Sequence, residues 1–279
     1  MTPMTEPALS AAPAIPAYRE MQRVTLPRVM RSEWTKLRSL PSTLWLLVAT
    51  VVLVAGGGLL AALLQLSDLP RGHAAIAAFN PAGLSLTGVG LAELTAGALG
   101  VLVVSGEYAT GQIRLTFTAV PRRLPVLWGK AVAIVLSVLA VSLASTLTAF
   151  FVTQAILAPH HLSATLGDPG VARAVFGSAL LLTGVALLGL AIGALLRSTA
   201  GAICTLFGLL YGLTIVAGFL PGHLAAEIRK YLPENAGSDI GAVHPNAATL
   251  TPWTGFGLFC AYTAVVLGLS AWLLRRRDA

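Results

Sequence analysis

Long apolar segments alternate with short polar connections along this chain. Each is close to or above the about 20 residues that a helix needs to cross the about 30 Å hydrocarbon core of a bilayer. The six segments cover about residues 42–66, 83–104, 126–157, 172–196, 199–220 and 255–274. Amphipathic helices of a soluble protein would have polar faces, and these segments have almost none. The pattern therefore predicts an all-α membrane protein with six transmembrane helices.

Basic residues are unevenly distributed among the connections. Fourteen of the 18 lysines and arginines lie before the first segment, around the connection between the second and third, between the fourth and fifth, or after the sixth. The other connections hold only Arg71, Arg173, Arg229 and Lys230. By the positive-inside rule, this asymmetry predicts a multi-pass protein of the plasma membrane with both termini in the cytoplasm. It also accounts for the net charge of +7 without a nucleic-acid partner.

The composition leaves no room for a separate soluble catalytic domain. Hydrophobic residues make up 56% of the 279 residues and charged residues 10%, whereas a soluble domain has about 25% charged residues. We expect residues 1–27 to form a disordered cytoplasmic tail and residues 28–279 to form one six-span domain that contacts membrane lipids.

Residues 28–40 predict an amphipathic helix in the headgroup plane. Its apolar positions recur at i, i+4 and i+7, at Met30, Trp34 and Leu37. Lys36 and Arg38 supply charge on other faces. The helix is expected to end at Pro41, just before the first span.

Two connections are long enough to form helices of their own. Residues 107–119, between the second and third spans, predict a short helix on the cytoplasmic side with Ile113 and Phe117 on one face. Residues 222–232, within the long outward segment 221–252, predict an amphipathic helix that rests on the outer leaflet or dips into it. Outward segments of this length usually cover or plug something.

The fourth and fifth spans are separated only by a tight turn at residues 196–199. Each contains a GxxxG pair, Gly189 with Gly193 and Gly208 with Gly212. Such pairs allow close helix packing, although chance pairs are common in a chain with 28 glycines.

Candidate chemistry is sparse. None of the three lysines is followed by Ser or Thr, so the chain has no GxxxxGK[ST] loop for ATP. We predict no catalytic residues and no metal site, because all five histidines fall in the outward segments without a spaced thiol or carboxylate partner. Glu93 is the one acidic residue deep in a span. It either lines a pathway or has a structural role, and the lack of a basic or His partner within the spans argues against a proton relay.

Several motifs resemble a known family. They are SEWTKLRSLPSTLW at 32–45, GEYATGQIRLTFTAVPRR at 106–123, GKA at 129–131, LLRSTAGA at 195–202 and YLPENAG at 231–237. Together they resemble the permeases of ABC transporters of the ABC-2 type, as found in actinobacteria. The resemblance covers the chain from about residue 28 onward, and residues 106–123 are its most specific part.

The resemblance implies a transport function that this chain would share with a separate ATPase. Such permeases pair as dimers, with a second copy or a paralogue, and each subunit docks on a separate ATPase that binds ATP and Mg. Residues 28–40 would be the connecting helix, the turn at 196–199 a second cytoplasmic contact, and 221–252 an outer cap with re-entrant helices. The coupling helix would contain Glu107, Tyr108, Gly111, Arg114 and Thr116. The expected activity is transport, as export of a hydrophobic or amphipathic compound.

Two alternatives remain open. One is an ATP-independent secondary transporter or membrane enzyme, which would require paired intramembrane charges or a polar catalytic cluster. The other is a non-transporting immunity or sensor protein.

Overall fold

A computed structural model describes residues 26–67, 70, 72–119, 123–246 and 249–276, which form helices and no strand. The helices are α1 (Leu26–Ser39), α2 (Pro41–Ser67), α3 (His73–Ala78), α4 (Pro81–Ser85), α5 (Val89–Ala109), α6 (Gln112–Ala119), α7 (Arg123–Leu157), η1 (Ala158–His160), α8 (Val171–Leu196), α9 (Thr199–Phe207), the π-helical turn η2 (Gly208–Gly212), α10 (Leu213–Ala217), α11 (Gly222–Arg229), α12 (Pro233–Ser238), η3 (Asp239–Gly241) and α13 (Pro252–Arg276). The predicted all-α fold is confirmed for this part of the chain. The predicted tail, residues 1–27, lies outside it except for Leu26 and Pro27, which begin α1.

Six helical stretches are long and apolar enough to cross a membrane. They are Pro41–Ser67, Pro81–Ala109, Leu124–His160, Val171–Leu196, Thr199–Ala217 and Pro252–Arg276. Each coincides with one predicted span, and the ends differ by a few residues. The chain is therefore a multi-pass membrane protein.

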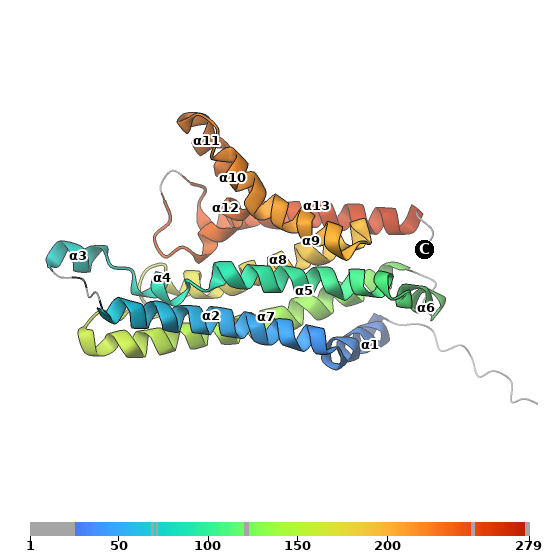
Figure 1. The fold of residues 1–279 in the computed structure, drawn as a ribbon, viewed down its shortest axis with the longest axis horizontal. Helices are drawn as coiled ribbons and strands as arrows, with labels where there is room; N and C mark the ends of the chain where they lie inside the picture. The colour runs from blue at the N-terminus through green and yellow to red at the C-terminus, as the bar shows by residue number, and fades with distance from the viewer. Residues whose placement is uncertain (1–25, 68–69, 71, 120–122, 247–248, 277–279) are drawn as a thin grey trace, which may run out of the picture.

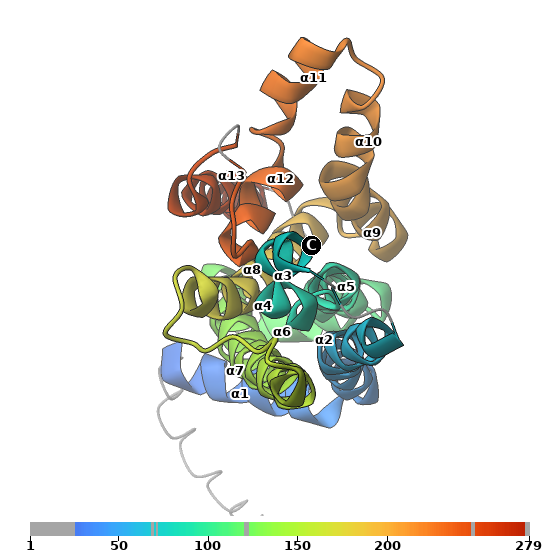
Figure 2. The ribbon, with the colours of Figure 1, turned by 90° about the vertical axis from the view of Figure 1, so that its left-hand side faces the viewer.

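Helix α8 is the centre of the bundle. Helices α5, α7, α9 and α13 pack around it (Figures 1 and 2). The most apolar window of α8 is 72% buried, whereas the corresponding windows of α2 and of α9–α10 are each 22% buried. The outer helices thus turn most of their surface toward lipid or a partner.

Close contact between α5 and α8 depends on glycine. Gly100 faces the carbonyl oxygen of Ala186, and Gly189 faces that of Gly97, so neither glycine has room for a Cβ atom. The first GxxxG pair therefore lies in a helix–helix contact. The second pair, Gly208 and Gly212, lies in η2 with nothing within 4 Å of where a Cβ would be.

The two ends of the bundle carry different connections. Helices α1 and α6 and the last turn of α13 lie at one end, which we call the α1 end (Figure 1). Helices α3 and α4 lie at the opposite end, which we call the α3 end. The described ends of the chain thus lie at the same end of the bundle, as an even number of spans requires.

The fifth span is irregular. A π-helical turn, η2, separates α9 from α10. Beyond it the chain bends away from the bundle into α11 (Figure 1). Single π-helical turns within α-helices are often found at functional sites.

The long segment between the fifth and sixth spans contains the helix expected at 222–232, as α11, which ends three residues early, and a second short helix, α12. Helix α11 ends at Arg229, and Pro233 begins α12, where a proline in the first turn leaves no donor unsatisfied. Helix α12 packs against α13, with Gly255 facing the carbonyl oxygen of Ala236. The outer segment thus brings polar side chains back against the spans.

Candidate functional site

Four charged side chains from three helices meet at the α1 end. Lys130 of α7 donates to Oε2 of Glu33 and to Oε1 of Glu107, both at 2.7 Å. Lys36 donates to Oε1 of Glu33 at 2.8 Å and to Oε1 of Glu107 at 2.9 Å. We call Glu33, Lys36, Glu107 and Lys130 the charge cluster. It joins α1 to the C-terminal end of α5 and to the N-terminal part of α7.

Local sequence explains how the charge cluster assembles. Glu33 and Lys36 are three residues apart on α1, so they lie on one side of that helix. Leu37, next to them, is 5% exposed and holds this side of α1 against the bundle. Trp34 is 40% exposed on another side of α1, while Glu33 is 3% exposed.

Burial makes the balance of charge in the cluster important. Glu33, Lys130 and Glu107 are buried, and only Lys36 reaches the surface. An unpaired charge at such a site would be strongly unfavourable, whereas two carboxylates and two ammonium groups neutralise one another. Burial lowers the pKa of Lys36, but hydrogen bonds to Glu33 and Glu107 outweigh it and hold this pKa above its ordinary value of 10.5. Lys36 is therefore an internal ion-pair partner that also reaches the surface.

The tight turn between α8 and α9 contacts the same end of α5. The guanidinium of Arg197 lies 5.2 Å from the ring centroid of Tyr108, within the range of a cation–π interaction. Thr199 donates to the hydroxyl of Ser105 at 2.9 Å. The last turn of α5 is thus joined to α1 and α7 through Glu107, and to the α8–α9 turn through Tyr108 and Ser105.

The expected coupling segment is divided between two helices. Glu107 and Tyr108 belong to α5, which ends at Ala109, and Gly111 has φ 72°, a left-handed conformation that turns the chain into α6. Thr116 lies on α6 and donates to the carbonyl oxygen of Gln112 at 3.2 Å. The side chain of Arg114 lies outside the described part of the structure.

Helix α6 has an inner and an outer side. Ile113 is 6% exposed and packs inward, as expected for the apolar face. Leu115 is 73% exposed. The side chain of Phe117, the other predicted apolar position, is outside the described residues.

The second polar site surrounds Glu93. Its side chain is 2% exposed and accepts a 2.9 Å hydrogen bond from the hydroxyl of Tyr211, which also lies 3.2 Å from the carbonyl oxygen of Gly90. The carboxyl group of Glu234, on α12, lies close enough to that of Glu93 for the two to interact electrostatically. We call Glu93 and Glu234 the carboxyl pair. Two neighbouring carboxyl groups repel each other when both are ionised, so the pair is sensitive to its state of protonation.

The carboxyl pair adds a neighbour that the sequence did not indicate. Glu234 is acidic and is supplied by the outer segment, not by another span. A neighbouring contact holds that segment in place, because Thr214 of α10 donates to Oδ1 of Asn235 at 3.0 Å. Tyr211 belongs to η2, so the irregular turn of the fifth span faces this site.

Metal ligands do not gather in the part of the chain that the structure describes, where no three His, Cys, Asp or Glu side chains form a group that could hold an ion. The chain matches no protein-family model, and a search of curated proteins finds no match either.

Proposed function

We propose that this chain is the membrane-spanning subunit of an ABC-type exporter that is powered by a separate ATPase. The α1 end faces the cytoplasm of the cell, in line with the excess of basic residues in its connections. ATP and Mg are bound by the ATPase partner. Two copies of this chain, or this chain and a paralogue, form the transport unit.

One observation carries the proposal: the last turn of α5, which leads directly into α6, is bonded to three other parts of the bundle. Glu107 contacts Lys36 of α1 and Lys130 of α7. Tyr108 contacts Arg197 in the α8–α9 turn. Helix α6 follows after a two-residue turn, with Leu115 exposed for a partner. A displacement of α6 by a motor protein would therefore reach α1, α5, α7 and α8 together.

The proposed mechanism is alternating access. ATP closes the two ATPase subunits, α6 moves with them, and the spans reopen toward the opposite side of the membrane. Such a cycle requires contacts that differ between the two states. The charge cluster suits this role because its lysines each contact both carboxylates, so small helix shifts can exchange partners without leaving a buried charge unpaired.

The substrate class follows from the spans. They offer few polar side chains for a sugar or an ion, which favours a hydrophobic or amphipathic cargo. Strongly exposed apolar side chains on the fifth span, such as Ile215 at 64% and Val216 at 62%, leave a surface for lipid or for the second subunit.

The test is whether the reading frame beside this chain encodes an ABC-type ATPase and whether that ATPase docks on this chain. We expect Leu115→Asp to abolish co-purification of the two proteins and stimulation of ATP hydrolysis. Leu40→Asp is the matched control, because Leu40 is also exposed, at 47%, and lies between α1 and α2 at the same end of the bundle. If the ATPase binds and turns over equally with both variants, α6 is not the docking helix.

The carboxyl pair favours a second candidate function, a proton-coupled secondary transporter. A carboxyl group within a span, such as that of Glu93, is a recurrent element of proton pathways. In proteoliposomes, uptake driven by a pH gradient without the ATPase, and lost in Glu93→Gln, would support this candidate. Transport that requires ATP and the ATPase, at a rate independent of the pH gradient, would exclude it.

A further inference from the structure

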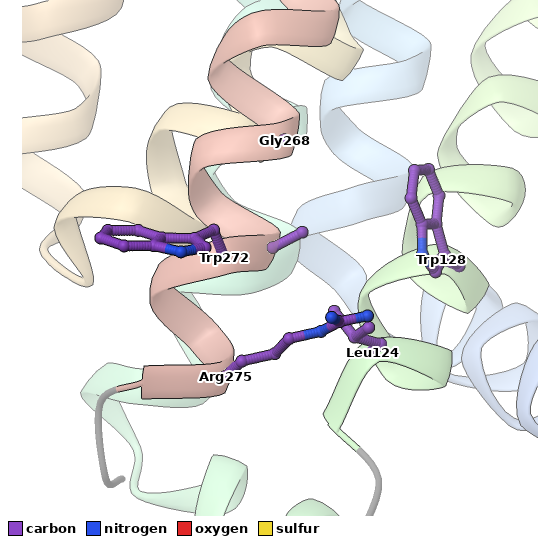
Figure 3. A pocket seen from close by; sticks show the side chains of 6 residues that line it. Leu124, Trp128, Gly268, Trp272 and Arg275 are labelled. Carbon is purple, nitrogen blue, oxygen red and sulfur yellow. The ribbon is translucent and has the colours of Figure 1, made fainter.

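A pocket opens between α7 and α13 at the α1 end, apart from both the charge cluster and the carboxyl pair. Its volume is about 220 Å³. Its lining comes from two helices and consists of Leu124, Trp128, Gly268, Ala271, Trp272 and Arg275 (Figure 3). We propose that this pocket binds the headgroup region of one anionic phospholipid, with the phosphate at Arg275.

The arginine supplies the charge that such a ligand requires. Figure 3 shows the side chain of Arg275 extending across the gap between the helices toward Leu124. Within the described residues, Arg275 has neither a carboxylate nor any other hydrogen-bonding partner. Its guanidinium is therefore available to bind a phosphate with two parallel hydrogen bonds. Basic pockets between transmembrane helices are known recognition sites for anionic lipid headgroups.

The tryptophans locate the pocket at the membrane–water boundary. Trp128 and Trp272 are 46% and 48% exposed, and half-exposed tryptophans typically lie at headgroup level. Trp128 stands on the α7 side of the pocket, while the ring of Trp272 extends to the other side of α13 (Figure 3). The guanidinium of Arg276 lies 4.5 Å from the ring centroid of Trp272. The second arginine is thus held against the ring, and Arg275 remains for the ligand.

The α13 wall of the pocket is made of small residues. Gly268 and Ala271 lie three residues apart, and Arg275 follows one turn later on the same side. A Cβ atom at Gly268 would have nothing within 4 Å. Packing within this chain therefore does not require a glycine at position 268. The glycerol or the upper acyl chain of a bound lipid would occupy the space beside it.

Size also favours a lipid over a transported compound. Pockets for drug-sized ligands enclose about 300–1,000 Å³, so this one is too small to bury such a molecule. A phospholipid needs a smaller pocket, because its acyl chains remain in the bilayer and only the headgroup region enters the protein.

Native mass spectrometry of the purified full-length chain tests the proposal. Wild type is titrated with phosphatidylglycerol and, in parallel, with phosphatidylcholine. We expect one phosphatidylglycerol molecule per chain to be retained in preference to phosphatidylcholine. We expect Arg275→Gln to weaken retention at least about fivefold, the change that loss of one basic side chain near anionic lipid produces. Equal retention of the two lipids by wild type would overturn the proposal.

Gly268→Leu provides a second variant that keeps the charge and fills the space. Its control is Gly257→Leu, because Gly257 lies on the same helix and is equally free of neighbours within 4 Å. We expect the bound lipid to be lost only with Gly268→Leu. Arg31→Gln removes an exposed charge from α1, at the same end of the bundle, and should leave retention unchanged. Equal loss with Gly257→Leu or Arg31→Gln would mean that the lipid binds the general surface and would refute the pocket.

Two further outcomes would assign the pocket to another occupant. Displacement of phosphatidylglycerol by equimolar soluble glycerol phosphate would show a site for a free anion. Conversion of a dimer into a monomer by Gly268→Leu would show that a second copy covers the pocket. A stable oligomeric state, together with no displacement by glycerol phosphate, is the result that we expect.

Discussion

The hydroxyl of Tyr211 lies 2.9 Å from Oε2 of Glu93 and joins the π-helical turn of the fifth span to the second span. The same carboxyl group reaches Glu234 on α12. The approach of these two carboxyl groups joins the outer segment to the second span. Ionisation of both would place two carboxylates side by side in a poorly hydrated site, where their repulsion is strong.

The first prediction concerns the pH dependence of this attachment. Burial raises the pKa of Glu234 above its ordinary value of 4.5. The protonated form is thus favoured in the folded protein, and its contribution to stability is complete below the unfolded pKa and is lost as pH rises through the folded pKa. We expect the thermal unfolding midpoint of wild type to fall as the pH is raised above about 4.5, and that of Glu234→Gln to change much less.

Glu227→Gln is the control for this experiment. Glu227 lies on α11 in the same outer segment, but it is exposed and paired with Lys230. It should keep the wild-type pH dependence. If Glu234→Gln follows the wild-type curve as well, protonation of Glu234 does not stabilise the attachment of the outer segment.

The second prediction concerns the two lysines of the charge cluster. Lys130→Met leaves two buried carboxylates with one lysine, and breaking a buried ion pair in this way costs about 3–5 kcal/mol. Lys36 is 35% exposed along its side chain, so water can partly replace it, and Lys36→Met should cost roughly 1 kcal/mol. The free energies of unfolding in detergent should therefore rank wild type, then Lys36→Met, then Lys130→Met.

A double variant separates charge balance from side-chain packing. Lys130→Met combined with Glu107→Leu removes one charge of each sign and leaves Glu33 paired with Lys36. We expect it to be more stable than Lys130→Met alone. A double variant that is less stable than either single variant would mean that the cluster acts through packing and not through charge.

The spans and α1 were predictable from the sequence because each depends on the local pattern of apolar residues. The charge cluster was not, because its assembly depends on which sides of α1, α5 and α7 face one another. Glu33 was missed for this reason, although its spacing from Lys36 was visible, and Lys36 and Glu107 were expected to face headgroups and a partner protein.

Glu93 illustrates the same limit. The sequence showed that Glu93 lies in a span. Its neighbour Glu234, however, lies in a connection that the charge pattern placed on the outer side of the membrane. Only the return of α12 against α13 brings the two carboxyl groups together. Long-range contacts of this kind have no local signal in a single sequence.

The third prediction concerns transmission through the α8–α9 turn. Arg197 has φ 56°, a left-handed conformation that glycine adopts more readily than arginine. Arg197→Gly should therefore preserve the turn while removing the cation from the ring of Tyr108. If this contact couples the turn to α5, the variant should bind the ATPase normally but show weaker substrate stimulation of ATP hydrolysis. Unchanged stimulation, with an unchanged unfolding midpoint, would limit Arg197 to a local structural role.

The fourth prediction compares the two GxxxG pairs, which look equivalent in the sequence. Gly189 faces the backbone of α5 at Gly97, so the Cβ atom of Gly189→Ala would force α5 and α8 apart. Overpacking of this kind typically costs about 1–3 kcal/mol. Gly208 has nothing within 4 Å of a Cβ position, so Gly208→Ala should be neutral or stabilising by up to about 1 kcal/mol through helix propensity. Thermal unfolding of the two variants, purified side by side, measures the difference. Equal unfolding midpoints would contradict the close α5–α8 contact, on which the central position of α8 depends.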